Sequence, residues 1–154
     1  MPVPIWAGHY IGLPFMDHGR DRQGLDCWGL VRLVQAERFA RSLPSFSRDY
    51  DRTTNVARIS ALIERECTHW KRVALNSAAL GDVIVMRVRG APMHVGLVLG
   101  DSQMLHIEFG IDSVIEKYDG ARWKDRIHGF YRYQPFDHRI PPDDDPFEDI
   151  FTLS

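Results

Sequence analysis

The sequence predicts an α+β fold in which N-terminal helices pack on an antiparallel β-meander. Apolar residues recur at helical spacing in the first half of the chain, whereas the second half holds short apolar runs separated by turn-forming residues. Helices followed by a series of strands are typical of α+β domains. With 154 residues, 44% of them hydrophobic, the chain can bury one core. We therefore expect a single domain, which we assign to residues 1–136.

The first helix is expected at residues 28–41. Asp26 precedes it in a capping position, and Pro44 follows its end. Its inward face is formed by residues at helical spacing, namely Cys27, Leu30, Val31 and Val34.

A second helix is expected at residues 55–70, after the cap candidates Thr53 and Thr54. Its apolar residues also recur at helical spacing: Val56, Ile59, Ile63, Cys67 and Trp70. We interpret this stripe as core packing and not as a ligand site.

Strands are expected at residues 83–88, 93–99, 103–108, 113–117 and 127–133. Gly81 and Asp82 precede the first of them, and residues 90–92 form a turn before the second.

Two histidines lie on neighbouring strands of this expected sheet. If residues 100–102 form the loop, Gly96 lies opposite His106, and His94 and His106 become diagonal neighbours on one face. A loop of even length would place the two histidines on opposite faces. The position of this turn therefore decides whether the histidines meet.

Cys27 lies where a loop of turn formers gives way to the first helix. A helix N-terminus favours a thiolate over a thiol and can lower a cysteine pKa to roughly 3.5–7.5. Considered without partner residues, Cys27 is more simply interpreted as a small buried apolar side chain. With two histidines on one face, however, the three residues meet the needs of a thiolate nucleophile: His94 can accept the thiol proton, and His106 can orient His94.

A zinc site is the chemical alternative for the same residues, since cysteine and histidine both bind zinc. No fourth ligand is evident, and we expect neither a metal nor another cofactor. The second cysteine, Cys67, is expected in the core, so the two cysteines form no disulfide framework.

Four segments together resemble the NlpC-type family of papain-like cysteine peptidases, which cleave cell-wall peptides. They are YIGLPFMDHGRDRQGLDCWGLV, LGDVIVM, MHVGLVLGD and MLHIEFG, in the family's order, and the resemblance spans residues 10–133. It implies a papain-like NlpC-type fold with Cys27 as nucleophile, His94 as general base and His106 as the orienting third member.

The chain departs from the family pattern at two positions. Phe15 stands where members usually have a tyrosine whose hydroxyl serves the oxyanion site, and Tyr10 is the expected substitute. Trp28 follows the cysteine where serine is common, while the preceding Asp26 is retained. The resemblance therefore implies that Asp26, Trp28 and Tyr10 serve substrate binding or the oxyanion site. It also implies a substrate choice different from that of the typical γ-D-glutamyl-diaminopimelate endopeptidase.

Charge and targeting signals limit the expected partners. A net charge of −2 offers no electrostatic case for nucleic acid or an anionic membrane. The N-terminus shows no signal peptide, and no segment is long and apolar enough to span a bilayer. The expected substrate, peptidoglycan peptides, nevertheless lies outside the bacterial cytoplasm where the protein is made.

We expect a phage-like particle to carry the protein, whose N-terminus shows no signal peptide, to this substrate outside the cytoplasm. The segments YIGLPF and DCWGLVRLV resemble the family's branch in phage tails and gene transfer agents. We therefore expect a tail-tip or baseplate hydrolase that opens the cell wall for DNA delivery, with tail proteins as partners. The alternatives are a structural tail component with an unused site, or an amidase or acyltransferase on the same fold.

Residues 137–154 differ in composition from the domain. They combine prolines and acidic residues, which are typical of a solvated tail, with the apolar residues Phe147, Ile150, Phe151 and Leu153. A solvated tail and a docking segment remain equally open.

Overall fold

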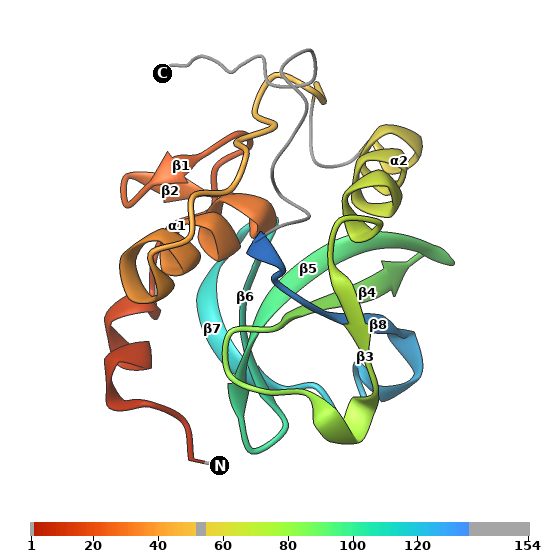
Figure 1. Cartoon of the computed structure of the whole chain (residues 1–154). Coiled ribbons are helices and arrows are strands. Elements are labelled where there is room, and N and C mark those ends of the chain that lie inside the picture. Colours follow the sequence, from red (N-terminus) through yellow and green to blue (C-terminus); the bar gives the residue numbers. More distant parts are fainter. Residues whose placement is uncertain (1, 52–54, 136–154) are drawn as a thin grey trace.

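A six-stranded antiparallel sheet and two α-helices form the body of the protein, and the computed structural model describes residues 2–51 and 55–135 (Figure 1). The helices are α1 (Cys27–Phe39) and α2 (Val56–Cys67). The sheet contains β3 (Lys71–Val73), β4 (Val83–Val88), β5 (Ala91–Gly100), β6 (Gln103–Glu108), β7 (Ile111–Lys117) and β8 (Ile127–Arg132). The expected α+β class is confirmed.

The strand order is β3-β8-β4-β5-β6-β7, so only β4 to β7 form a simple meander. β8 does not extend the sheet beyond β7 but returns to pair with β4, which therefore has partners on both sides. The short β3, which the sequence did not predict, pairs with β8 at the edge. Two further short strands, β1 (Arg20–Asp21) and β2 (Gly24–Leu25), form a separate hairpin just before α1.

The helix boundaries differ slightly from the expected ones. α1 begins one residue earlier and ends before Ala40, whose left-handed conformation (φ 54°) closes the helix ahead of Pro44. Asp26 is its N-cap, as expected, and accepts a hydrogen bond from the backbone of Gly29. α2 is capped by Asn55 and is shorter than predicted at both ends; the cap candidates Thr53 and Thr54 lie outside the described residues.

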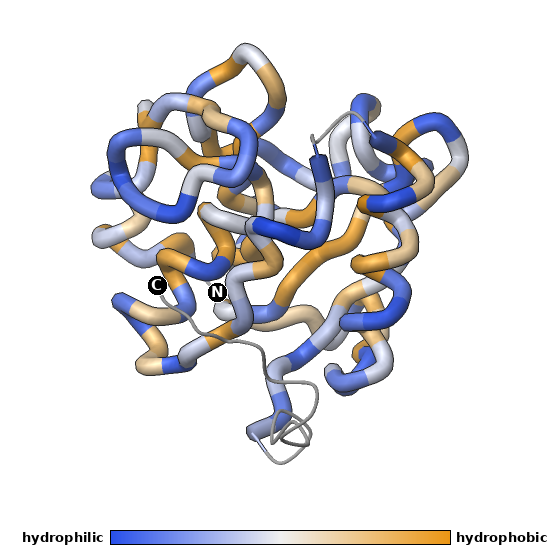
Figure 2. Tube along the Cα trace, turned by 90° about the horizontal axis from the view of Figure 1, so that it is seen from above, coloured by the Kyte–Doolittle hydropathy of each residue, from blue (hydrophilic) through white to orange (hydrophobic). Residues whose placement is uncertain are grey.

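The core lies between the helices and the sheet. Both helices contact β5, and the expected inward residues Leu30, Val31 and Val34 are fully buried. In Figure 2 the central strands are hydrophobic over much of their length, whereas many peripheral turns are hydrophilic. Within the described ranges, no helix has the length and apolar character needed to cross a membrane.

Between β5 and β6, Leu97 pairs with Leu105, a register that sets Gly96 against His106 as expected. The turn itself is shorter than predicted: Asp101 and Ser102 both adopt positive φ, as a two-residue type I′ turn requires. A register shift before Gly100 compensates for the even loop length. The two histidines therefore share a face despite the shorter turn.

The β1–β2 hairpin packs so tightly on α1 that Gly29 has no room for a side chain. A Cβ at this position would lie 2.0 Å from the carbonyl oxygen of Gly19. This close approach fixes the hairpin against the first turn of α1, where Cys27 lies.

Gly29→Ala is therefore expected to destabilise the protein by about 1–3 kcal/mol, since the backbone must move to admit the methyl group. Urea unfolding followed by circular dichroism measures this change. The control is Gly8→Ala in the 3-10 helix Ile5–Tyr10, where a Cβ meets no atom within 4 Å. An equal effect of the two substitutions would contradict the packing argument.

Candidate active site

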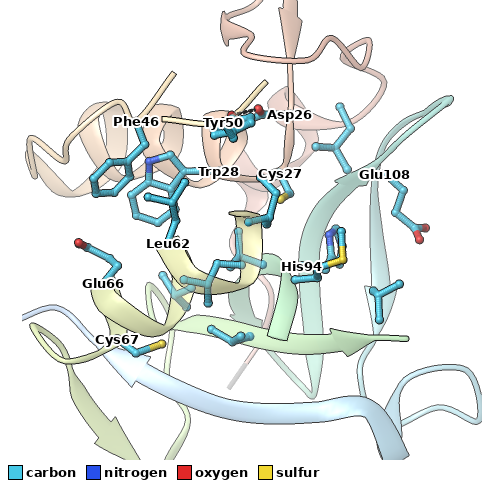
Figure 3. Close-up of a pocket in the computed structure, with 18 of the residues that line it drawn as sticks. Asp26, Cys27, Trp28, Phe46, Tyr50, Leu62, Glu66, Cys67, His94 and Glu108 are labelled. Atoms are coloured by element: carbon cyan, nitrogen blue, oxygen red, sulfur yellow. Dashed lines mark hydrogen bonds between the residues drawn. The ribbon is translucent and has the colours of Figure 1, made fainter. Parts of the chain in front are cut away.

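An apolar pocket of about 220 Å³ lies between the start of α1, one face of α2 and the sheet. Cys27 and His94 both line it and lie at the same end of the pocket (Figure 3). Its walls are formed largely by apolar side chains, among them Phe15, Trp28, Phe46, Ile59, Leu62, Val85, Val95 and Phe109.

The apolar stripe of α2 is part of this wall. Ile59, Ile63 and Cys67 line the pocket, although Ile63 and Cys67 also pack against a core cluster. The stripe was expected to serve the core alone. Only the tertiary structure shows that it also faces a cavity shared with Cys27.

Cys27 is the first residue of α1, which places its thiol at the helix N-terminus as the sequence predicted. The expected consequence, a lowered pKa, is wrong for this structure. Burial and the neighbouring charge of Asp26 raise the pKa of Cys27 to about 12, and hydrogen bonding by the backbone of Val95 and Trp28 offsets this only in part. At neutral pH the resting group is therefore a thiol.

A hydrogen-bonded chain of three side chains begins at His94. Nε2 of His94 lies 2.8 Å from Nδ1 of His106, and Nε2 of His106 lies 2.8 Å from a carboxylate oxygen of Glu116. His106 is fully buried and His94 almost so. The structure thus brings together the two histidines that the sequence paired and adds a carboxylate behind them.

The ionisation of this chain fixes its tautomers. Burial raises the pKa of Glu116, but the approach of the Trp123 indole, the hydrogen bond of His106 and the charge of Arg122 outweigh it and hold the pKa below its usual range. A carboxylate only accepts, so Nε2 of His106 donates to it. Burial lowers the pKa of His106, whose Nδ1 then accepts from Nε2 of His94.

His94 is left with an unprotonated Nδ1 as the nitrogen available to Cys27. Burial, with the neighbouring His106 and Arg122 adding to it, lowers the pKa of His94 to about 3, so the ring is neutral at neutral pH. The resting pair is therefore a neutral thiol and a neutral imidazole in the tautomer that a general base requires.

Trp123 and Arg122 support this chain, and the sequence analysis identified neither. The buried Trp123 ring stacks on His94 (centroids 5.6 Å apart) and meets His106 edge-on (5.5 Å). Arg122 forms ion pairs with Glu116 (3.0 Å) and Glu108 (2.7 Å).

Strand alternation could have indicated Glu116. His106 pairs with Val114 across β6 and β7, which makes Glu116 a diagonal neighbour on the same face. No comparable signal identifies Trp123 and Arg122, because both lie in an irregular segment after β7.

Asp26 does not project into the pocket as an exposed anion. It is 1% exposed and accepts hydrogen bonds from Nη1 of Arg20 (2.8 Å), the backbone of Gly29 (2.8 Å) and the backbone of His18 (3.1 Å). The hydroxyl of Tyr50 also donates to it. Arg20 and Tyr50 hold Asp26 in place, and the sequence analysis identified neither.

The structure removes Tyr10 from the expected oxyanion site. Its side chain is fully buried outside the pocket. Its hydroxyl donates a hydrogen bond to Glu37 (2.7 Å) and accepts one from Nε of Arg38 (3.1 Å). Phe15, at the position of the family tyrosine, does line the pocket. Tyr50, whose hydroxyl donates to Asp26, also lines the pocket.

Trp28 lines the pocket, as Cys27 does. Its indole nitrogen donates to the backbone oxygen of Pro44 (2.8 Å), and its ring lies 5.8 Å from that of Phe46. This anchoring makes Trp28 a fixed apolar wall beside Cys27.

Among the described residues, one group with metal-ligand chemistry shares His106 with the zinc site considered above but uses two carboxylates in place of Cys27 and His94. Ligand atoms of His106, Glu108 and Glu116 lie within 4.8 Å of one another. Arg122 already supplies a cation to both carboxylates.

The family model described as NlpC/P60 matches residues 12–132. The murein DD-endopeptidase MepS/murein LD-carboxypeptidase of Escherichia coli is 24% identical over 76% of this chain and 54% of its own length. The chain thus spans about half the length of the curated relatives it matches.

Solved structures show the same fold. An NlpC/P60 family protein from Bacillus cereus superposes with a TM-score of 0.63 at 20% identity, covering 86% of this chain and 41% of the other. The NlpC/P60 domain of peptidoglycan hydrolase SagA gives a TM-score of 0.56 at 22% identity, covering 81% and 91%. The chain belongs to the NlpC/P60 family.

Proposed function

We propose that the protein is a cysteine peptidase that hydrolyses peptide bonds of peptidoglycan. The observation that carries this proposal is the pairing of Cys27 with a base in the same pocket: His94 lines it and is held in the general-base tautomer by His106 and Glu116. The printed names of the relatives, which include a murein endopeptidase and a peptidoglycan hydrolase, support the choice of substrate.

The proposed reaction proceeds through a thioester. Nδ1 of His94 accepts the thiol proton while the sulfur of Cys27 attacks the carbonyl carbon of the scissile bond. When the C–N bond breaks, the amine leaves with the proton held by His94. Water then attacks the thioester with His94 again as base, which releases the acid and restores the thiol.

The neutral resting pair is suited to this sequence. Because the pKa of Cys27 is raised and that of His94 is lowered, proton transfer between them accompanies the attack and does not precede it. The imidazolium formed transiently on His94 is stabilised through His106 by the charge of Glu116.

We further propose that the protein acts in a phage-like tail tip or baseplate, made in the bacterial cytoplasm and carried to the cell wall in the particle. The support is the resemblance of residues 10–15 and 26–34 to the phage-tail and gene-transfer-agent branch of the family. The acidic residues 137–154 lie outside the described residues, and we propose them as the segment that docks to a tail protein.

Cys27→Ala is expected to abolish hydrolysis of purified peptidoglycan fragments, a loss of about 10³-fold or more, because the nucleophile is removed with little change in volume. Mass spectrometry of the products measures activity and identifies the bond cut, and thermal unfolding checks the fold. Cys67→Ala is the matched control and keeps most of the activity. Full activity of folded Cys27→Ala would exclude the proposed mechanism.

Glu116→Ala is expected to lower kcat about 10- to 100-fold with little change in KM, because His106 loses the acceptor that fixes its tautomer. Glu116→Gln restores part of this loss, since the amide oxygen can still accept from Nε2 of His106. His94→Ala, which removes the proposed general base itself, gives the low activity with which the Glu116 variants are compared. An unchanged kcat in Glu116→Ala would show that the carboxylate does not position the histidines.

The full-length protein is expected to co-purify with phage-like particles, whereas a chain ending at residue 136 is expected in the free fraction. Immunoblots of purified particles measure this. The truncated chain should keep its activity on soluble fragments, because Cys27, His94 and His106 lie upstream. Particle binding by the truncated chain would exclude the docking segment, and absence of the full-length protein from particles would exclude the tail assignment.

A further inference from the structure

Three carboxylates line the described pocket, and each already has donors within the protein. They belong to Asp26, Glu66 and Glu108. A substrate that brings a free amine into this pocket needs one of them as a counter-charge, because a cation removed from water without a partner is strongly disfavoured.

The lone pairs of Asp26 are fully used. One oxygen accepts from Gly29 (2.8 Å) and Arg20 (2.8 Å), and the other accepts from the backbone of His18 (3.1 Å) and from the Tyr50 hydroxyl. A carboxylate offers about four lone-pair sites in total. With 1% exposure, Asp26 presents no acceptor to a ligand, and Arg20 already supplies the positive charge.

The other two carboxylates are no better placed. Both oxygens of Glu108 lie 2.7 Å from the guanidinium of Arg122. Glu66 accepts from the indole of Trp70 (3.0 Å) and lies beside Cys67 on α2, at the opposite end of the pocket from His94 in Figure 3.

The remaining walls near Cys27 are apolar. Phe15, Trp28 and Phe109 line the same pocket, and Trp28 is fixed by its hydrogen bond to Pro44. Such a surface binds methyl, methylene and uncharged amide groups. An ammonium there would lose hydration and gain only cation–π attraction to the aromatic rings, which is weaker than pairing with a carboxylate.

We propose that the acyl part of the substrate that lies against Cys27 carries no free α-amine: the amine is acylated, as it is when a stem peptide is still attached to its glycan strand. This inference rests on the proposed peptidase function and specifies its substrate class. Intact wall material would then be cut in preference to released peptides, and the Arg20–Asp26 pair is the feature of this chain that sets the preference.

The test compares two forms of one peptidoglycan stem tetrapeptide, with its N-terminal amine free or acetylated. The acetylated form is expected to be cleaved with a kcat/KM about 10-fold higher or more, which corresponds to a difference of about 1.4 kcal/mol. Equal cleavage, or preference for the free amine, would overturn the inference while leaving the peptidase function intact. If neither form is cleaved and intact peptidoglycan is not cleaved either, both the proposed function and the inference are overturned.

Arg20→Gln tests the origin of the preference. Removal of the guanidinium leaves Asp26 with an unpaired charge, so the ratio of kcat/KM for acetylated over free peptide is expected to fall. This ratio does not depend on how much of the variant is folded, because both substrates meet the same active fraction. The matched control is Arg22→Gln, which breaks an exposed ion pair with Glu37 outside the pocket and should leave the ratio unchanged. If the Arg20→Gln variant still cleaves both peptides and the ratio is unchanged, Arg20 does not set the preference.

Discussion

The buried carboxylate of Asp26 is the interaction on which the active-site end of the protein depends. It caps α1 through Gly29 and also binds Arg20 and Tyr50, so one side chain joins the helix, the hairpin before it and the loop after it. Breaking a buried ion pair of this kind typically costs about 3–5 kcal/mol, because the remaining charge is left without a partner. The position of Cys27 follows directly, since it is the next residue of the chain.

The sheet provides the other half of the site by a different constraint, that of register. The bulge before Gly100 keeps His94 and His106 on one face, and the pairing of β6 with β7 brings Glu116 to the same face. The ionised Glu116 then determines the tautomer of each histidine in turn. Electrostatic control of the base therefore comes from β7, whereas the nucleophile is carried by α1. Burial favours the neutral forms of both Cys27 and His94.

Much of the fold could be predicted because local patterns determine it. The inward stripe of α1, the Asp26 cap and the strands β4 to β7 follow from periodicity and turn residues, which act over a few positions. The pairing of β8 with β4, the edge strand β3 and the β1–β2 hairpin could not be predicted in this way. Strand order depends on contacts between segments distant in sequence, and β1 to β3 are too short to show a period.

The sequence by itself determined that Cys27 starts a helix and that His94 and His106 can share a sheet face, because both statements depend only on local spacing. Only the tertiary structure decided their surroundings. It placed Glu116 behind the histidines, moved Tyr10 out of the site, and raised the pKa of Cys27 where the helix terminus alone would lower it. The physical reason is that burial and charge pairing act through space, between groups whose separation along the chain carries no information about their distance.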